Sequence, residues 1–144
     1  MQIIRYESEE QLRRAFGVMH ELRTHLDEDG YMELLAEMIP QGYELYGIED
    51  EGEIKALAGI AERTNFYYGR YIWVFDLITT ESARSQGYGE KLLGHIEDIG
   101  RERDCDVVAL SSGVQRVDAH RFYEDKMAYD RFSYTFRKNL SGRF

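Results

Sequence analysis

The feature that most constrains this chain is a six-residue stretch, Arg84-Ser85-Gln86-Gly87-Tyr88-Gly89, between a strand-like run and a helix-like run. The run before it, 71–78, is rich in aromatic and β-branched residues, whereas leucine and isoleucine recur at helical spacing in the run after it. A strand is therefore expected to lead through a glycine-containing turn into a helix. The unpaired N–H groups and the positive dipole end of such a helix suit an anion such as a pyrophosphate, and the glycines let the backbone approach it.

Three phosphate-binding patterns can be compared with this stretch. A P-loop requires G-x-x-x-x-G-K-[ST], and the chain lacks both the first glycine and the Lys-Ser/Thr pair. A dinucleotide fingerprint requires G-x-G-x-x-G, and Leu92 stands where its third glycine would be. The pattern present is R-x-x-G-x-G, which resembles the acetyl-CoA pyrophosphate loop of the GNAT superfamily of N-acetyltransferases. For the six residues alone, the alternative interpretation is a purely structural turn.

Length and composition are typical of one folded domain. The chain has 144 residues, 43% hydrophobic and 31% charged, so we expect a single domain over 1–144 with a substantial core. No apolar run approaches the roughly 20 residues of a membrane helix, and the first residues lack the layout of a signal peptide. The single cysteine, Cys105, excludes an internal disulfide and is typical of a reducing compartment, so we expect a cytoplasmic protein.

The net charge of −9 limits the class of partner. A negative field repels nucleic acids and anionic membranes, so we expect neither as a partner. The same field attracts cations and suits an amine substrate, although simple solubility explains the charge equally well. The histidines do not form a metal set, because His20 and His25 are five residues apart rather than four and only one cysteine is present. We therefore expect no metal.

Periodicity and turn signals predict the element order β-α-α-β-β-β-α-β-α-β. The strands are expected at 1–6, 43–48, 54–61, 70–79, 106–111 and 132–136, and the helices after Ser8 and at 31–39, 87–103 and 117–126. A capping box at Ser8–Gln11 starts the first helix, and 27–30 and 49–52 are expected to be turns. The predicted fold class is α/β (α+β), with a mixed, mostly antiparallel central sheet flanked by helices and one parallel pair around the glycine turn.

A second stretch strengthens the resemblance. Residues 119–129 are similar to the GNAT segment usually written A-x-x-F-Y-E-K-x-G-[FY], with Ala119, Phe122, Tyr123 and Glu124 matching and Lys126 displaced by one place. Two linked motifs in the right order are far more specific than either alone. The resemblance covers about 70–136 well and the first half only through the order of its elements. It implies a GNAT-like fold and the use of acetyl-CoA.

Two positions depart from the family pattern. The family often has an asparagine three residues before the motif alanine, where its side chain can bond the pantetheine, and this chain has Arg116 there. The glycine usual before the last aromatic residue is Ala128, which suggests a slightly different turn.

The resemblance also implies roles for individual residues. Backbone amides of the glycine turn, with the Arg84 side chain, would hold the phosphates, and the preceding strand end would pair with the pantetheine and supply an oxyanion hole. The residues expected to bind acetyl-CoA are thus Leu77, Ile78, Thr79, Arg84, Ser85, Gln86, Gly87, Tyr88, Gly89 and Arg116. Tyr123 is the candidate general acid for the leaving thiolate, since a tyrosine with a pKa of about 10 is protonated at neutral pH.

The sequence identifies the general base less clearly than the general acid. Asp76 lies on the strand beside Trp73 and Phe75, where partial burial could raise its pKa and let it act as a base, directly or through water. Asp76 as a structural hydrogen-bond acceptor is an equal alternative, and Glu62 is a weaker candidate. An acceptor amine with a low pKa would need no dedicated base.

The acceptor site is expected where similar proteins build it, from the first two helices and the loop between the third and fourth strands. The candidate residues are Asp27, Glu28, Tyr31 and Tyr67, with Asp29, Phe66 and Tyr68 beside them. Carboxylates and aromatic faces suit a cation. A solvated acidic turn and a surface aromatic hairpin are the alternative interpretation of these residues.

The predicted function is an acetyl-CoA-dependent N-acetyltransferase acting on a small, cationic primary amine by direct attack on the thioester. The alternatives are a protein lysine or N-terminal acetyltransferase, and a non-catalytic acyl-CoA-binding module that would not need Tyr123. A closed pocket lined by Tyr31 and Tyr67 would favour a small acceptor, and an open groove a protein. The aromatic last strand, 132–136, suggests a homodimer in which it pairs with a second chain.

Overall fold

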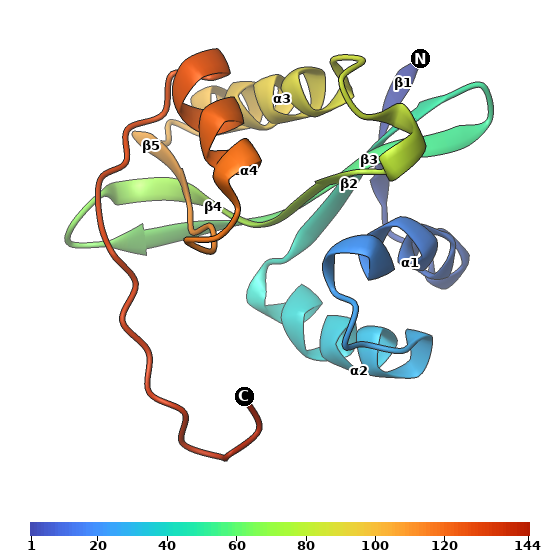
Figure 1. The fold of residues 1–144 in the computed structure, drawn as a ribbon, viewed down its shortest axis with the longest axis horizontal. Coiled ribbons are helices and arrows are strands. Elements are labelled where there is room, and N and C mark those ends of the chain that lie inside the picture. Colours follow the sequence, from blue (N-terminus) through green and yellow to red (C-terminus); the bar gives the residue numbers. More distant parts are fainter. The chain divides into compact units, whose positions relative to one another are not determined.

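The computed structural model describes residues 1–144 and consists of two compact units, 1–110 and 111–144. The first unit contains a sheet and three α-helices (Figure 1). Its elements are β1 Gln2–Tyr6, α1 Glu9–Leu22, α2 Glu28–Met38, β2 Glu44–Asp50, β3 Glu53–Asn65, β4 Gly69–Thr79, α3 Tyr88–Glu102 and β5 Val107–Leu110, with short 3-10 helices at Ile39–Gln41 and Glu81–Ala83. None of the helices combines the length and apolar character that crossing a membrane requires.

The five strands lie in the order β1-β2-β3-β4-β5. The first four are antiparallel neighbours, and β4 and β5 are parallel, with α3 as the crossover between them. The β2–β3 hairpin turns through Glu51 and Gly52, both at positive φ, as the turn signal at 49–52 predicts. The predicted mixed, mostly antiparallel sheet flanked by helices is therefore confirmed.

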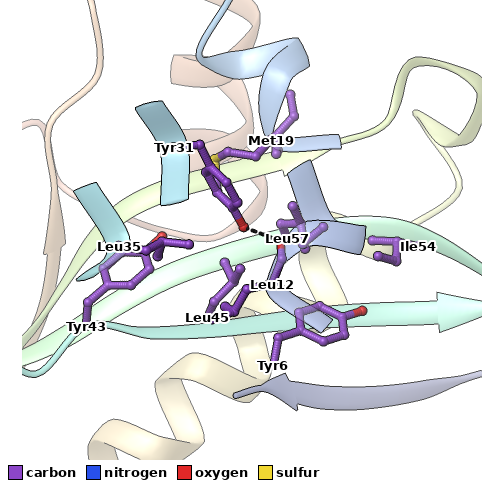
Figure 2. Packing of buried hydrophobic residues seen from close by; sticks show 11 residues of the cluster. Tyr6, Leu12, Met19, Tyr31, Leu35, Tyr43, Leu45, Ile54 and Leu57 are labelled. Carbon is purple, nitrogen blue, oxygen red and sulfur yellow. Dashed lines mark hydrogen bonds between the residues drawn. The ribbon is translucent and has the colours of Figure 1, made fainter. Parts of the chain in front are cut away.

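Helices cover both faces of this sheet, with α1 and α2 on one side and α3 on the other (Figure 1). Between the sheet and the helices α1 and α2 lies a cluster of buried side chains, which Figure 2 shows around Leu45 and Leu57. On the other side, α3 contributes the buried residues Leu92, Leu93 and Ile96. Because both faces are covered, β3 is buried almost along its whole first half, as a central strand should be.

The starts of α1 and α2 both follow from capping chemistry. The Ser8 hydroxyl accepts from the Gln11 N–H and the Gln11 side chain accepts from the Ser8 N–H, which confirms the predicted capping box. The acidic segment 27–30, expected to be a turn, instead begins α2: the Asp27 carboxylate accepts from the Gly30 N–H at 2.7 Å. A carboxylate at the N-cap and acidic residues in the first turn stabilise a helix start there.

The second unit contains one short helix, α4 Val117–Arg121, which continues into a π-helical turn over Phe122–Lys126. The last strand expected at 132–136 is not formed, and 127–139 has neither helix nor strand. The alternating aromatic residues of that segment are exposed, with Phe136 at 92%. Alternating apolar and polar residues give a strand one apolar face, but a strand also needs hydrogen-bond partners along its backbone. The sheet of this structure ends at β5, so no strand pairs with this segment.

Candidate active site

The second half of β4 lies where the sheet opens. β5 pairs only with residues 71–74, here called the closed segment of β4. Residues 75–79 are here called the open segment: 76–79 pair with β3 on one edge, and no strand of the sheet pairs with the other edge. An open strand edge presents backbone N–H and C=O groups to an extended ligand, which can bind as an added strand does. Leu77, Ile78 and Thr79, the residues expected to meet the pantetheine, end this segment.

A β-bulge marks the boundary between the two segments. Val74 lies opposite Ile60 and Asp76 lies opposite Gly59, so Phe75 between them has no partner on β3. Such a bulge bends its strand and changes the direction of the residues that follow. The bend coincides with the point at which β5 stops following β4.

Asp76, the candidate base, is buried next to this bulge and is hydrogen-bonded on both oxygens. Its Oδ2 accepts from the Tyr43 hydroxyl at 2.7 Å, and its Oδ1 accepts from Arg23 Nε at 3.0 Å. Arg23 also donates through Nη2 to the carbonyl of Phe75 at 2.8 Å. Burial and the Asp76 charge raise the pKa of Tyr43 well above its ordinary value, so this hydroxyl stays protonated and donates. The geometry is that of a structural acceptor, and the role of Asp76 as a base stays a prediction.

The turn after β4 has the backbone conformation that an anion requires. Ser85 and Gly87 both adopt left-handed conformations, with φ of +64° and +87°. Gly87 is the N-cap of α3 and no side chain caps this helix, so its first N–H groups have no partner within the helix. Consecutive N–H groups around left-handed positions form concavities that bind anions. Arg84, Ser85 and Gln86 are exposed there, as a phosphate-binding role requires.

Tyr88 faces away from this concavity. Its side chain is buried, and its hydroxyl donates to Asp50 Oδ2 at 2.9 Å at the end of β2. Any contribution of Tyr88 to an anion site is therefore through its backbone N–H. The contact also anchors the start of α3 to the β2–β3 hairpin.

Tyr123 and Arg116 belong to the second unit, and the structure brings these two together. Tyr123 lies in the π-helical turn, is 8% exposed, and packs against the rings of Phe122 and Tyr129. Burial raises the pKa of Tyr123, while the Arg116 charge opposes that shift. The hydroxyl is thus protonated at neutral pH, as a proton donor must be. The turn ends at Ala128 with a φ of +61°, a conformation that glycine adopts more readily, which explains the glycine usual in the motif.

The four acceptor candidates are not gathered in one place. Asp27 caps α2, and Glu28 lies 3.5 Å from Arg13 at the exposed start of that helix. Tyr31 is 4% exposed and its hydroxyl donates to the carbonyl of Leu12 at 2.7 Å, so it is part of the core (Figure 2). Tyr67 lies 67% exposed in the β3–β4 turn.

The two tyrosines do not meet. Burial, and after it the nearby Asp76 charge, raises the pKa of Tyr31, whereas Tyr67 precedes the first residue of β4. At about 3.3 Å per residue, the start of β4 lies about 23 Å from Asp76. A closed pocket lined by Tyr31 and Tyr67 is therefore not part of this structure. Glu62, the weaker base candidate, lies opposite Ile72 of the closed segment and 3.9 Å from both Arg70 and Arg103.

Three residues that no sequence pattern singled out support this region: Glu21, Arg23 and Tyr43. Arg23 and Tyr43 hold Asp76, and Glu21 accepts hydrogen bonds from Thr80 and Glu81 just before the turn. Each lies more than 30 positions from its partner in the chain. Periodicity and motif spacing report only on near neighbours, so no signal in the sequence identifies these pairs.

The fold and motifs can be compared with known proteins. Residues 8–129 match the model of the family described as "Acetyltransferase (GNAT) family". A curated relative from Bacillus subtilis (strain 168), "Uncharacterized N-acetyltransferase YhdJ", is 41% identical over 132 residues, covering 91% of this chain and 93% of the relative. The "Aminoalkylphosphonate N-acetyltransferase" of Salmonella typhimurium (strain LT2) is 27% identical over 90 residues, covering 62% of this chain and 58% of that protein.

Solved structures show the same fold. The structure of aminoglycoside N-acetyltransferase AAC(6')-Iy in complex with CoA has a TM-score of 0.84 at 12% identity, and covers 96% of this chain and 94% of that one. The family model spans residues 8–129, and the relative at 41% identity covers 91% of this chain. The chain therefore belongs to the acetyltransferase (GNAT) family and is an N-acetyltransferase.

Proposed function

We propose that this N-acetyltransferase transfers the acetyl group of acetyl-CoA to a small, cationic primary amine. The observation that carries the proposal is the open segment of β4, which leads through the short 3-10 helix Glu81–Ala83 into the left-handed turn at 84–89. The free strand edge fits the amide groups of an extended pantetheine, and the uncapped start of α3 fits a pyrophosphate. The two features follow each other along one stretch of chain, as the two parts of the donor do.

In this proposal the backbone of the open segment orients the thioester. An N–H of 77–79 that is directed away from β3 donates to the carbonyl oxygen, where negative charge develops when the amine attacks. The N–C bond forms and the C–S bond breaks. Tyr123 then gives its proton to the departing sulfur, which its raised pKa allows at neutral pH.

The amine must lose a proton before or during its attack. Asp76 is the candidate base, but Tyr43 and Arg23 occupy both of its oxygens. Asp76 would therefore act through a water molecule or give up one of these partners. An amine with a low pKa would not need Asp76 as a base. If Asp76 is only structural, the pH dependence of turnover should therefore reflect the pKa of the amine.

The negative charge of the chain supports a cationic amine as the acceptor. Asp27 and Glu28 lie at the exposed start of α2, directly after the turn that follows α1, and the whole chain carries a net charge of −9. Carboxylates at this position would attract a cationic amine. Changing Asp27, Glu28 and Asp29 to their amides should raise KM for the amine and leave KM for acetyl-CoA unchanged. An unchanged KM for the amine would exclude this surface as the acceptor site.

The donor half of the proposal is tested by isothermal titration with acetyl-CoA, CoA and ATP. Binding of both CoA species at micromolar concentration, without binding of ATP, is the expected result. Absence of acetyl-CoA binding would mean that the turn at 84–89 is structural. An amine panel followed by thiol release should then include polyamines, aminoalkylphosphonates, a lysine peptide and an N-terminal peptide. Turnover of the peptides alone would favour the protein-acceptor alternative.

Tyr123→Phe separates an enzyme from a binding module. If Tyr123 is the general acid, we expect kcat to fall about 100-fold while Kd for acetyl-CoA changes little. Stopped assays with free thiol detection give kcat, and titration gives Kd. Unchanged turnover would remove Tyr123 from the mechanism. No turnover with any amine by the wild-type protein, despite tight acetyl-CoA binding, would favour the non-catalytic module.

We also propose a cytoplasmic homodimer. Tyr134 and Phe136 are 81% and 92% exposed, and the alternation of their segment suits pairing with a second chain. Light scattering should give twice the monomer mass of 16.9 kDa. Tyr134→Ser combined with Phe136→Ser should return the monomer mass, and a monomeric wild-type protein would contradict the dimer. Cell fractionation tests the location.

A further inference from the structure

The last turn of α1 contacts the chain at the end of the open segment. The Glu21 carboxylate accepts from the Thr80 hydroxyl through Oε2 at 2.5 Å and from the Glu81 N–H through Oε1 at 2.9 Å. Both oxygens of one side chain thus hold two consecutive residues, about 60 positions away in the sequence. These two residues form the corner where β4 ends and the connection to the 84–89 turn begins.

The corner also has backbone hydrogen bonds: the Thr80 N–H donates to the carbonyl of Lys55 at 2.9 Å, and the carbonyls of Thr80 and Glu81 accept from Ala83 and Arg84 at 2.9 Å and 3.4 Å. No side chain of its own segment caps the 3-10 helix Glu81–Ala83. The preceding open segment is paired on one edge only. Glu21 therefore supplies from another element the cap that the local sequence lacks. A segment with few backbone partners is more mobile, and a ligand that binds it must order it first.

We propose that Glu21 is a positioning residue for acetyl-CoA. It holds the Thr80–Glu81 corner so that the N–H groups of the 84–89 turn are already directed at the phosphates before the donor binds. The inference rests on the proposed donor site. In this role Glu21 acts through the corner and not on the donor, since its two oxygens bind Thr80 and Glu81.

Two competing roles for Glu21 predict different results. If Glu21 only caps the 3-10 helix, its loss should lower the melting temperature and leave acetyl-CoA binding unchanged. If its charge dominates, a carboxylate near a phosphate site should oppose binding, so neutralising it should make binding tighter. Positioning predicts weaker binding on loss of Glu21, and it predicts that a neutral side chain of the same shape restores binding.

The test uses Glu21→Ala, Glu21→Gln, Thr80→Val, and the double variant Glu21→Ala with Thr80→Val. Glu9→Ala is the matched control, since Glu9 is on the same helix and pairs only with exposed Arg13. Titration gives Kd for acetyl-CoA, steady-state kinetics give kcat and KM, and thermal melts monitor folding. Glutamine keeps an oxygen for the Glu81 N–H and offers an N–H₂ group to the Thr80 oxygen.

We expect Glu21→Ala and Thr80→Val each to weaken acetyl-CoA binding about 10-fold, which is the cost of ordering a few side chains and a short loop. The double variant should bind no more weakly than Glu21→Ala alone, because Thr80→Val removes only the hydroxyl contact that Glu21→Ala already removes. Glu21→Gln should stay within a few-fold of wild type, and kcat at saturating donor should be nearly unchanged in all of them. Glu9→Ala should bind as wild type.

A wild-type Kd for Glu21→Ala, or tighter binding by Glu21→Ala and Glu21→Gln alike, would overturn the positioning role. Arg84→Glu, measured in parallel, separates this outcome from failure of the donor site, since it places a negative charge in the exposed turn itself. Weak binding by Arg84→Glu with a wild-type Kd for Glu21→Ala would remove only the role of Glu21. A wild-type Kd for Arg84→Glu would remove the proposed donor site and the role of Glu21 with it.

Discussion

The closed and open segments of β4 belong to one strand but are supported differently. The closed segment, 71–74, has strands on both edges, and Ile72 within it is fully buried. The open segment, 75–79, has a strand on one edge, and the side chains of Arg23, directly after α1, and Tyr43, directly before β2, supply further support. Backbone pairing stabilises the first, whereas a few long-range polar contacts position the second. Within β4, the part with fewer strand partners is therefore the part that leaves one backbone edge free.

The strongest way to break the open segment is to fill the space beside Asp76. A Cβ at Gly59 would lie 1.8 Å from the Tyr43 hydroxyl oxygen and 2.6 Å from Asp76 Oδ2. Tyr43 is buried and cannot turn away without leaving Asp76, so we expect Gly59→Ala to lower the free energy of unfolding by about 4 kcal/mol.

Urea unfolding followed by circular dichroism measures this change. Gly94→Ala on α3 is the matched control, because a Cβ there meets nothing within 4 Å. It should stabilise the protein by up to about 1 kcal/mol, since alanine favours helix more than glycine does. A Gly59→Ala variant as stable as wild type would mean that the Tyr43–Asp76 contact does not hold this region.

A change in the closed segment should affect stability alone. Ile72 is 0% exposed, so Ile72→Ala leaves a cavity and should cost about 3 kcal/mol of unfolding free energy. The Kd for acetyl-CoA, measured at a temperature where the variant is folded, should remain that of wild type because the closed segment does not meet the donor. A large rise in Kd would mean that the two segments are not independent.

A change in the side chains that support the open segment should affect both stability and acetyl-CoA binding. Arg23→Ala removes the donor to both Asp76 and the Phe75 carbonyl, and we expect a loss of about 2 kcal/mol in unfolding free energy. Here the Kd for acetyl-CoA should also rise, about fivefold, because the open segment loses its position.

Arg23→Lys is the matched variant for this position. It keeps the charge but cannot make both contacts in the same geometry, so its effects should be intermediate. Titration and urea unfolding of the two variants give the comparison. A normal Kd for Arg23→Ala would show that α1 does not position the open segment.

The smallest effect concerns an ion pair beside the closed segment. Glu44, on β2, lies opposite Ile60 of β3. Its carboxylate accepts hydrogen bonds from Nη1 and Nη2 of Arg103 at 2.7 Å and 2.8 Å. Burial raises the pKa of Glu44, but hydrogen bonds from Arg103 and Tyr46 outweigh that effect and leave it below its ordinary value of 4.5. A lowered pKa in the folded state means that this stabilisation is complete above pH 4.5 and is lost as the pH falls through the lowered value.

We therefore expect the free energy of unfolding to decrease below about pH 4.5, and Glu44→Gln to remove part of that slope. Urea unfolding between pH 3 and pH 7 measures the slope. The donor Kd near neutral pH should not change in Glu44→Gln, since the pair supports the closed side of the sheet. An unchanged slope in Glu44→Gln would mean that other carboxylates account for the acid sensitivity.

The parts of the fold that were predictable depend on near neighbours in the chain. The capping box at Ser8, the hairpin turn at 49–52 and the strand-turn-helix around Gly87 each follow from a few consecutive residues, and all three are formed. The predicted turn at 27–30 is wrong because the same acidic residues are also good helix starters. The predicted strand at 132–136 is absent because alternation does not supply a partner.

Local patterns in the sequence were enough to predict the family, the element order up to α4 and the position of the turn at 84–89. The contacts of Asp76 with Arg23 and Tyr43, the core position of Tyr31 and the support of the Thr80–Glu81 corner by Glu21 become visible only in the folded chain. The physical reason is that burial and hydrogen bonding at these positions join residues 19 to 60 positions apart, and only folding brings them within 3 Å.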